Sequence, residues 1–176
     1  MSSFDAFLQL DGVPGEATDD KHKDWIELLD FSHGMSQPAS STKSSAGGGT
    51  TGRTQHSDFM IHKYIDKASP KLYDAVSTGK HFGKAKIEVC RAGGGQVKFM
   101  EINFEEVVIS SVQMASNNGS AGNGTAAADV HAGFPTEQVS LNYGKIEWIY
   151  TQQKRKDGSG GGNVSAKYDL TAGKAG

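Results

Sequence analysis

The sequence has little cysteine, no excess of basic charge and no long hydrophobic run. A single cysteine, Cys90, among 176 residues cannot form an internal disulfide, so nothing requires an oxidising compartment. The 18 Lys and Arg against 20 Asp and Glu give a formal net charge of −2, which argues against a dedicated nucleic-acid binder. No apolar run approaches the ~18 residues of a membrane-spanning helix, and residues 1–8 lack the pattern of a secretory signal. We therefore expect a soluble chain made in the cytoplasm, with no membrane insertion and no nucleic-acid partner.

Recognisable catalytic and metal-binding patterns are also missing. The six histidines are scattered, with no pair four residues apart on a predicted helix. No serine lies in a Gly-x-Ser-x-Gly sequence, so a serine hydrolase has no support. Residues 77–81 contain the Gly-Lys pair of a phosphate-binding loop, but they close a predicted helix instead of opening one. We expect no catalytic, cofactor-binding or metal-binding residues, and therefore no enzyme.

Glycine is the residue in excess. The 23 glycines make up about 13% of the chain, close to twice the usual ~7%. They cluster at 47–49, 93–95 and 158–162, between stretches of ordinary composition. Such clustering is typical of a β-rich protein with long connections, and the length suits one domain over residues 1–176.

Alternation of apolar and polar residues predicts most of the strands. It is visible over residues 4–10, 59–65, 84–89, 100–104, 105–114, 137–153 and 164–170. In a further strand, Trp25, Leu29 and Phe31 would share the apolar face, with Ser32 on the other face. One short helix is also predicted, with Ser69 as N-cap, Pro70 at the first helical position and Gly79 at the end.

The apolar positions change parity within residues 137–153. Val139 and Leu141 are odd-numbered whereas Ile146 and Trp148 are even-numbered, so a bulge or bend is expected near Gly144. Bulges of this kind are typical of a sheet that curls. The predicted fold is mainly β: a compact β-barrel of curved antiparallel sheets, flanked by one short α-helix, with a long Gly/Ser-rich extended loop.

That loop lies between residues 36 and 57, where the apolar periodicity disappears. Segment 37–52 consists almost wholly of small and polar residues, and loops of this length in a compact domain are either functional or disordered. Two interpretations stay open, a surface loop without a role and an arm that becomes ordered against a partner.

Several peptides occur in an order that resembles one protein family. They are Phe4-Asp5-Ala6-Phe7-Leu8, residues 15–26, Gly34-Met35-Ser36-Gln37-Pro38, residues 66–72, Thr78-Gly79-Lys80-His81, residues 90–94 and Tyr150-Thr151-Gln152-Gln153-Lys154. Together they are similar to Hcp, the haemolysin-coregulated protein of type VI secretion systems, and they are collinear with it over nearly the whole chain. At position 33 this sequence has His where the family commonly has Trp.

The resemblance implies a structural role. Proteins of this family are small β-barrels that form hexameric rings with an open lumen. The rings stack into a tube inside a contractile sheath, whose contraction drives the tube and its spike out of the cell, and some rings carry effector proteins. The resemblance therefore implies a tube subunit whose partners are itself, as a homo-hexamer, the sheath and spike proteins, and effectors. It also implies secretion to the extracellular space or a target cell without a signal peptide.

Two groups of site residues follow from the resemblance. The family's extended loop lies in the Gly-rich region, so the candidate contacts between subunits or rings are Ser44, Gly47, Gly48, Gly49, Thr50 and Thr51. Ser32 is the candidate residue for contact with cargo in the lumen; alternatively, it faces solvent and has no cargo role. The alternative function of the whole chain is a monomeric cytoplasmic β-barrel that binds a small ligand.

Overall fold

The computed structural model describes residues 4–38, 52–93, 97–116, 134–153 and 160–175. Within these residues the chain forms one helix and a series of antiparallel strands. In chain order they are β1 (Phe4–Leu10), β2 (Ile26–Leu28), β3 (Asp30–Ser32), β4 (Met35–Ser36), β5 (Gln55–His56), β6 (Phe59–Tyr64), α1 (Ser69–Thr78), β7 (His81–Arg91), β8 (Lys98–Ala115), β9 (Thr136–Asn142), β10 (Lys145–Gln153), β11 (Gly160–Asp169) and β12 (Lys174–Ala175).

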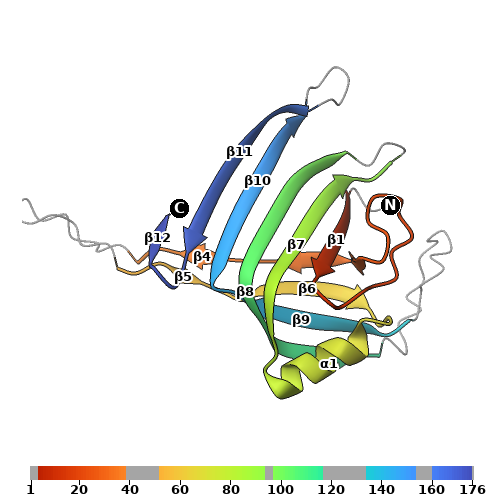
Figure 1. The fold of residues 1–176 in the computed structure, drawn as a ribbon. Coiled ribbons are helices and arrows are strands. Elements are labelled where there is room, and N and C mark those ends of the chain that lie inside the picture. Colours follow the sequence, from red (N-terminus) through yellow and green to blue (C-terminus); the bar gives the residue numbers. More distant parts are fainter. Residues whose placement is uncertain (1–3, 39–51, 94–96, 117–133, 154–159, 176) are drawn as a thin grey trace, which may run out of the picture.

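The long strand β8 joins two sheets. Its second half pairs with β9 and its first half with β10, so β9 and β10 follow one another along the same edge of β8. Beyond β9 the pairing continues to β6 and β3, whereas beyond β10 it continues to β11 and β12; β7, β1 and β2 lie on the other edge of β8. We call β2-β1-β7-β8-β10-β11-β12 the upright sheet and β3-β6-β9, with the end of β8, the crossing sheet (Figure 1).

The expected bend near Gly144 lies between β9 and β10. The Gly144 N–H donates to the carbonyls of Glu105 and Glu106, at 3.0 and 3.2 Å, and Glu106 has a φ of 56°. A Cβ at position 144 would lie against the Glu106 side chain, so a larger residue would require that side chain to move. The bend therefore places β9 and β10 in different sheets. Across it, the apolar side chains change from odd-numbered to even-numbered positions.

The mainly β, antiparallel architecture with one short helix is confirmed, although strand pairing in the described residues does not close into a complete barrel. β2 pairs with β1 and β3 pairs with β6, and the chain crosses from one sheet to the other at Leu29. Ile26 and Leu28 are buried and Phe31 packs against the core, while Leu29 is 40% exposed, so the expected apolar face of Trp25, Leu29 and Phe31 is wrong. At this crossing the parity of the core-facing side chains changes, whereas the predicted alternation assumed one continuous strand.

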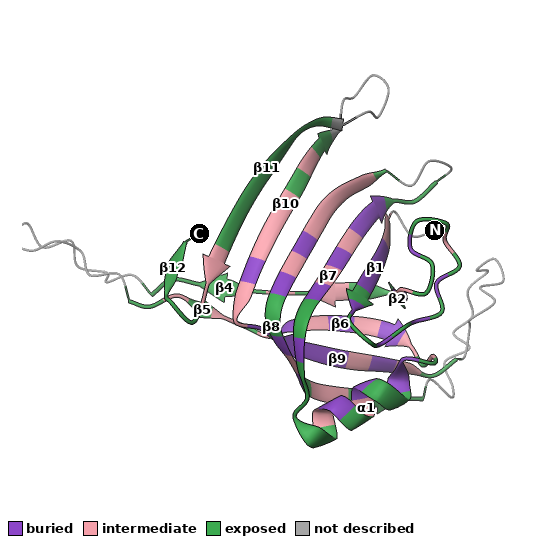
Figure 2. Ribbon diagram, in the orientation of Figure 1, coloured by how far each residue is buried: buried purple, intermediate pink, exposed green. Residues whose placement is uncertain are grey.

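The core lies between the two sheets (Figure 2). Apolar side chains in register across the upright sheet, such as Leu8, Ile87 and Ile102, face the crossing-sheet residues Phe59 and Leu141. At one end α1 covers this core with Leu72 and Ala75. No helix among the described residues has the length and apolar character needed to cross a membrane.

The helix begins and ends close to the expected residues, but its N-cap differs. Ala68 occupies the cap position and has no side-chain cap bond, while Ser69 lies in the first turn with its hydroxyl buried. Pro70 is at the start and Gly79 closes the helix with a φ of 67°, as predicted. The Ser69 assignment was wrong because a buried carboxylate competes for its hydroxyl.

Candidate assembly interface

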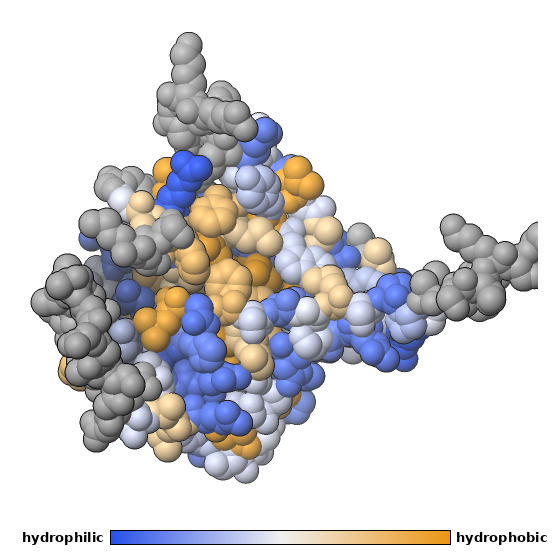
Figure 3. Space-filling model, turned by 180° about the vertical axis from the view of Figure 1, so that it is seen from behind, coloured by the Kyte–Doolittle hydropathy of each residue, from blue (hydrophilic) through white to orange (hydrophobic). Residues whose placement is uncertain are grey.

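The apolar face of the upright sheet extends beyond the part that the crossing sheet covers. Val89, Met100, Tyr150 and Val164 follow one another in register across β7, β8, β10 and β11. Exposure rises along this row from 2% at Val89 to 47% at Tyr150 and 69% at Val164. Seen from behind, apolar side chains gather on this face above a polar band (Figure 3). We call this part of the face the open strip; it consists of the half-buried Met100 and Trp148 and the exposed Tyr150, Val164 and Ala166.

The open strip ends at an incompletely paired strand. β12 pairs only with Tyr168 and Asp169 of β11, so within the described residues the outer edge of β11 from 161 to 166 has no strand beside it. Such an edge presents unpaired backbone N–H and C=O groups. An apolar face together with an open backbone edge is the kind of surface that another polypeptide covers.

The opposite face of the upright sheet carries charged side chains that pair with one another. Lys98 bridges Glu88 and Glu101, and Lys86 lies 3.7 Å from Glu101. Asn103 donates to Glu101 at 2.9 Å and to a third carboxylate, that of Glu147, at 3.4 Å. These pairs form a charged ladder across β7, β8 and β10.

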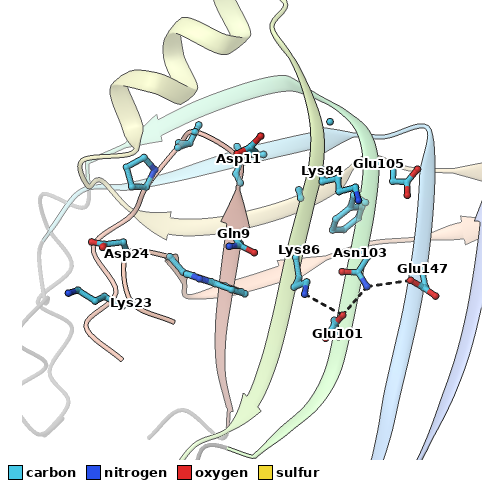
Figure 4. A pocket seen from close by; sticks show the side chains of 18 residues that line it. Gln9, Asp11, Lys23, Asp24, Lys84, Lys86, Glu101, Asn103, Glu105 and Glu147 are labelled. Carbon is cyan, nitrogen blue, oxygen red and sulfur yellow. Dashed lines mark hydrogen bonds and ion pairs between the residues drawn. The ribbon is translucent and has the colours of Figure 1, made fainter. Parts of the chain in front are cut away.

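A groove of about 930 Å³ lies beside this ladder, between the sheet and the loop after β1 (Figure 4). In the close-up, Lys86, Glu101, Asn103 and Glu147 are joined to one another across the strands, whereas Lys23 and Asp24 lie apart on the loop, so the charged groups do not converge on one point. In the described part of the chain, no group of three or more His, Cys, Asp or Glu could hold a metal ion. The groove therefore gives the ligand-binding alternative little chemical support.

The loop before β2 is fixed by a buried histidine. His22 is stacked on Phe7 with ring centroids 4.2 Å apart, and its two ring nitrogens contact Asp19 at 2.5 Å and Glu88 at 3.0 Å. Gly15 lies against the backbone of Trp25, where a side chain would collide. The motif over residues 15–26 thus has a structural role: it holds this loop against the upright sheet.

At the α1 end, a second buried cluster fastens the helix to the crossing sheet. The Lys63 ammonium is fully buried and donates to Glu137 at 2.7 Å and to Asp66 at 2.8 Å. Ser69 and Tyr73 of α1 donate to the two oxygens of the same Glu137 carboxylate, at 2.7 and 2.6 Å. Burial, together with the Glu137 carboxylate, raises the pKa of Tyr73 to about 12. Every charge of this cluster has a partner.

At the opposite end of β6, two histidines share one phenol. His33 Nε2 lies 2.6 Å and His56 Nδ1 2.9 Å from the Tyr143 hydroxyl. Burial lowers the pKa of both imidazoles, that of His33 further because His56 is near, and burial raises the pKa of Tyr143. These three residues, the His33–Tyr143–His56 trio, hold β4 and β5 against the body of the protein; β4 and β5 are called the arm.

The predicted site residues fall in two places. Ser32 is exposed on β3 and lies in register with Met60, Ser140 and Ser111, on the outer face of the crossing sheet. Next to this row, Asp30 is in register with His62 and hydrogen-bonds to it. The six loop residues Ser44, Gly47, Gly48, Gly49, Thr50 and Thr51 lie outside the described residues.

Sequence reasoning missed three groups of residues. Lys63 follows Phe59 and Ile61 at the same parity, and this lysine in an apolar series was an available signal for the buried cluster. The strand expected over residues 59–65 ends at Tyr64, and Ile65 is 39% exposed instead of continuing the apolar series. The His33–Tyr143 contact joins residues 110 apart, and the open strip consists of ordinary alternating residues, so neither had a local signal.

Known proteins resemble this chain in both sequence and fold. The family model described as "Type VI secretion system effector, Hcp" matches residues 7–150. "Protein hcp1" of Pseudomonas aeruginosa is 36% identical over 167 residues, which is 94% of each chain, and "Major exported protein" of the same organism is 28% identical over 139 residues, 77% of this chain and 74% of that one. A solved "type six secretion system protein" has a TM-score of 0.85 at 31% identity, covering 98% of this chain and 99% of that one. Hcp1 from Salmonella typhimurium has a TM-score of 0.74 at 25% identity over 99% of both chains.

Proposed function

The chain belongs to the Hcp family of type VI secretion proteins, and we propose that it is a structural subunit of the inner tube. In this proposal, six copies form a ring, rings stack, and contraction of the sheath expels the tube with its spike. The subunit itself performs no catalysis. The single observation that carries the proposal is the open strip, an apolar face that the chain builds but does not cover.

A neighbouring copy is the natural cover for the open strip. Ring closure with identical subunits requires a heterologous contact, in which one surface of each subunit meets a different surface of the next. Covering the Val164 side chain completely would contribute about 1.5–3 kcal/mol per contact. In the same contact, the backbone N–H and C=O groups at the outer edge of β11 would gain hydrogen-bond partners. This favours the β11 edge and the open strip as the ring interface.

The mass of the purified protein tests the ring. Light scattering on a sizing column is expected to give six times the 18.7 kDa chain, with ring-shaped particles in negative stain. Val164→Asp should lower the mass to that of smaller species, because a carboxylate would be buried without a partner. Met114→Asp is the matched control, since Met114 is 64% exposed and lies away from the open strip at the end of β8. A stable wild-type monomer at high concentration would favour the ligand-binding barrel instead.

Stacking of rings is assigned in this proposal to the Gly-rich loop, with Ser44, Gly47, Gly48, Gly49, Thr50 and Thr51 as its contacts. Glycine lets such a segment adapt to its partner, at an ordering cost that keeps stacking weak. Deleting residues 44–51 should leave single rings intact and reduce tubes in electron micrographs. Unchanged tube length in the deletion variant would contradict the assignment.

Ser32 is proposed as a contact for effectors carried in the ring. Its support is chemical: the outer face of the crossing sheet offers hydroxyl and amide groups from Ser32, Ser111 and Gln138, with few charges. Ser32→Gln should reduce the proteins that co-purify with the ring, measured by mass spectrometry, without changing its mass. Ser77→Gln on the exposed side of α1 is the control, and equal losses in both variants would argue against a cargo role.

Export from the cell completes the proposal. A relative named "Major exported protein" supports export of this chain. The test is detection of the protein in culture medium of the intact strain and its loss from the medium when the sheath protein is removed. Equal amounts in the medium of both strains would contradict export by sheath contraction.

A further inference from the structure

The His33–Tyr143–His56 trio joins the arm to the body through one oxygen atom. His33 lies between β3 and β4, His56 ends β5, and Tyr143 lies in the bend between β9 and β10. Each imidazole also stacks on a ring of the body: His33 on Phe59, with centroids 5.2 Å apart, and His56 on Tyr168, at 5.4 Å. Both strands of the arm are therefore attached at the same point.

Few other contacts hold the arm in the described residues. Its internal bonds, such as Ser57 N–H to the Gly34 carbonyl at 2.9 Å, tie the two strands to each other rather than to the body. The Arg53 guanidinium donates to the Leu170 carbonyl at 3.0 Å, which is an exposed contact. The trio is consequently the main polar attachment.

The hydrogen bonds of the trio depend on protonation. A phenol hydroxyl has one proton to donate and can accept from another group. With at least one neutral imidazole, Tyr143 donates to a ring nitrogen and accepts an N–H from the other histidine. With both imidazoles protonated, neither Nε2 of His33 nor Nδ1 of His56 can accept, and two like charges point at one oxygen.

The charged groups around the trio do not compensate these charges. Asp58, which precedes β6, accepts from Asn142 at 2.9 Å and from Ser110, and Glu106 lies beside Gly144. Lys145 and Asp169 pair with each other on the opposite face of β10 and β11. The remaining neighbours from β8, β10 and β11 are aromatic: Phe104, Trp148 and Tyr168. In the described part of the chain, neither imidazole has a carboxylate partner.

We propose that the His33–Tyr143–His56 trio is an acid-sensitive attachment, and that protonation of both histidines releases the arm from the body. The release is a property of the single subunit, so it does not depend on ring formation. Burial lowers the pKa of both histidines in the folded state, which leaves the detached arm with the higher proton affinity. Attachment is therefore complete above about pH 6.5 and is lost as the pH falls.

Hydrogen exchange on the full-length chain, with rates corrected for intrinsic pH dependence, tests the proposal at pH 7.5 and pH 5.0. A two-stranded ribbon without a body to pack against is marginally stable in water, so release should also open the arm's own hydrogen bonds. We expect protection of the Ser57 amide, which donates to the Gly34 carbonyl, to fall at least tenfold at pH 5.0, while amides paired between β6 and β9 keep theirs. Light scattering at both pH values distinguishes release of the arm from any change in assembly.

Three variants give the controls. His33→Phe keeps an aromatic ring against Phe59 and leaves His56 as the only histidine at Tyr143, so the loss of arm protection at pH 5.0 should be smaller than in the wild type. His33→Phe/His56→Phe should remove the acid response. His62→Gln removes a different titrating histidine and should retain the wild-type response. Arm protection that is equal at both pH values in the wild type, or a full wild-type acid response in His33→Phe/His56→Phe, would overturn the proposal. If His33→Phe does not fold, nuclear magnetic resonance titration of the wild type decides: His33 and His56 must titrate below about pH 6.5.

Discussion

The two ends of β6 hold their neighbours by different chemistry. At the Lys63 end, a buried ion pair with all its hydrogen bonds satisfied fastens α1 over the core. At the Phe59 end, a neutral trio fastens the arm, and the upright sheet continues toward β11, which is largely exposed (Figure 2). The first arrangement closes the molecule on itself, whereas the second leaves it able to bind another chain.

The largest expected effect is at the closed end. Glu137→Ala should lower the free energy of unfolding by about 3–5 kcal/mol, because it leaves the Lys63 ammonium buried without its partner. Urea denaturation measures this loss. The double variant Lys63→Met/Glu137→Leu should be more stable than Glu137→Ala, since no unpaired charge stays buried. A double variant as unstable as the single one would mean that packing, not charge, dominates the cluster.

Removing one phenol hydroxyl at each end compares the two attachments directly. Tyr73→Phe takes a donor from the Glu137 carboxylate and should cost about 1.5–3 kcal/mol at pH 7.5. Tyr143→Phe removes hydrogen bonds between neutral groups and should cost about 1 kcal/mol. The second cost should shrink at pH 5, because the wild-type trio has already lost its bonds there. An equal cost of Tyr143→Phe at both pH values would show that its hydroxyl acts independently of the histidines.

Two Val→Ala substitutions in the same row of residues compare the covered and uncovered parts of the upright sheet. Val89→Ala should cost about 2 kcal/mol, since it removes buried methyl groups and leaves a cavity. Val164→Ala should change the stability of the dissociated subunit by less than about 0.5 kcal/mol while weakening self-association. Denaturation at low concentration and light scattering at high concentration separate the two effects. Similar stability losses in both variants would mean that Val164 is covered within the subunit.

The smallest expected effect is at His62, whose contribution to stability has the opposite pH dependence to that of the trio. The hydrogen bond with Asp30 raises the pKa of His62, so this pair stabilises the fold at low pH and its contribution disappears as the pH rises through the raised pKa. Both side chains are more than a third exposed, so screening limits the effect of His62→Gln to a few tenths of a kcal/mol. Relative to the wild type, His62→Gln should therefore lower the melting temperature slightly more at pH 5.5 than at pH 8.0. A larger loss at pH 8.0 would contradict the sign.

Much of the fold could be predicted from the sequence, and less of the candidate interface. The strand at 4–10, the hairpin of β7 and β8, the bend at Gly144 and the end of α1 at Gly79 all rest on local patterns, because side-chain alternation and glycine geometry act over a few residues. Ser32 was correctly expected on a strand with an exposed side chain. The open strip could not be predicted, since its residues alternate as the buried ones do.

The sequence by itself determined the mainly β architecture, the single short helix and, through collinear motifs, the Hcp family. Only the tertiary structure decided which apolar residues are covered, that Lys63 is buried opposite Glu137, and that His33 and His56 meet at Tyr143. The physical reason is the separation along the chain over which each kind of interaction acts. Backbone preferences and periodicity depend on near neighbours, whereas burial and the pairing of charges depend on residues that the fold brings together from about 70 to 110 positions away.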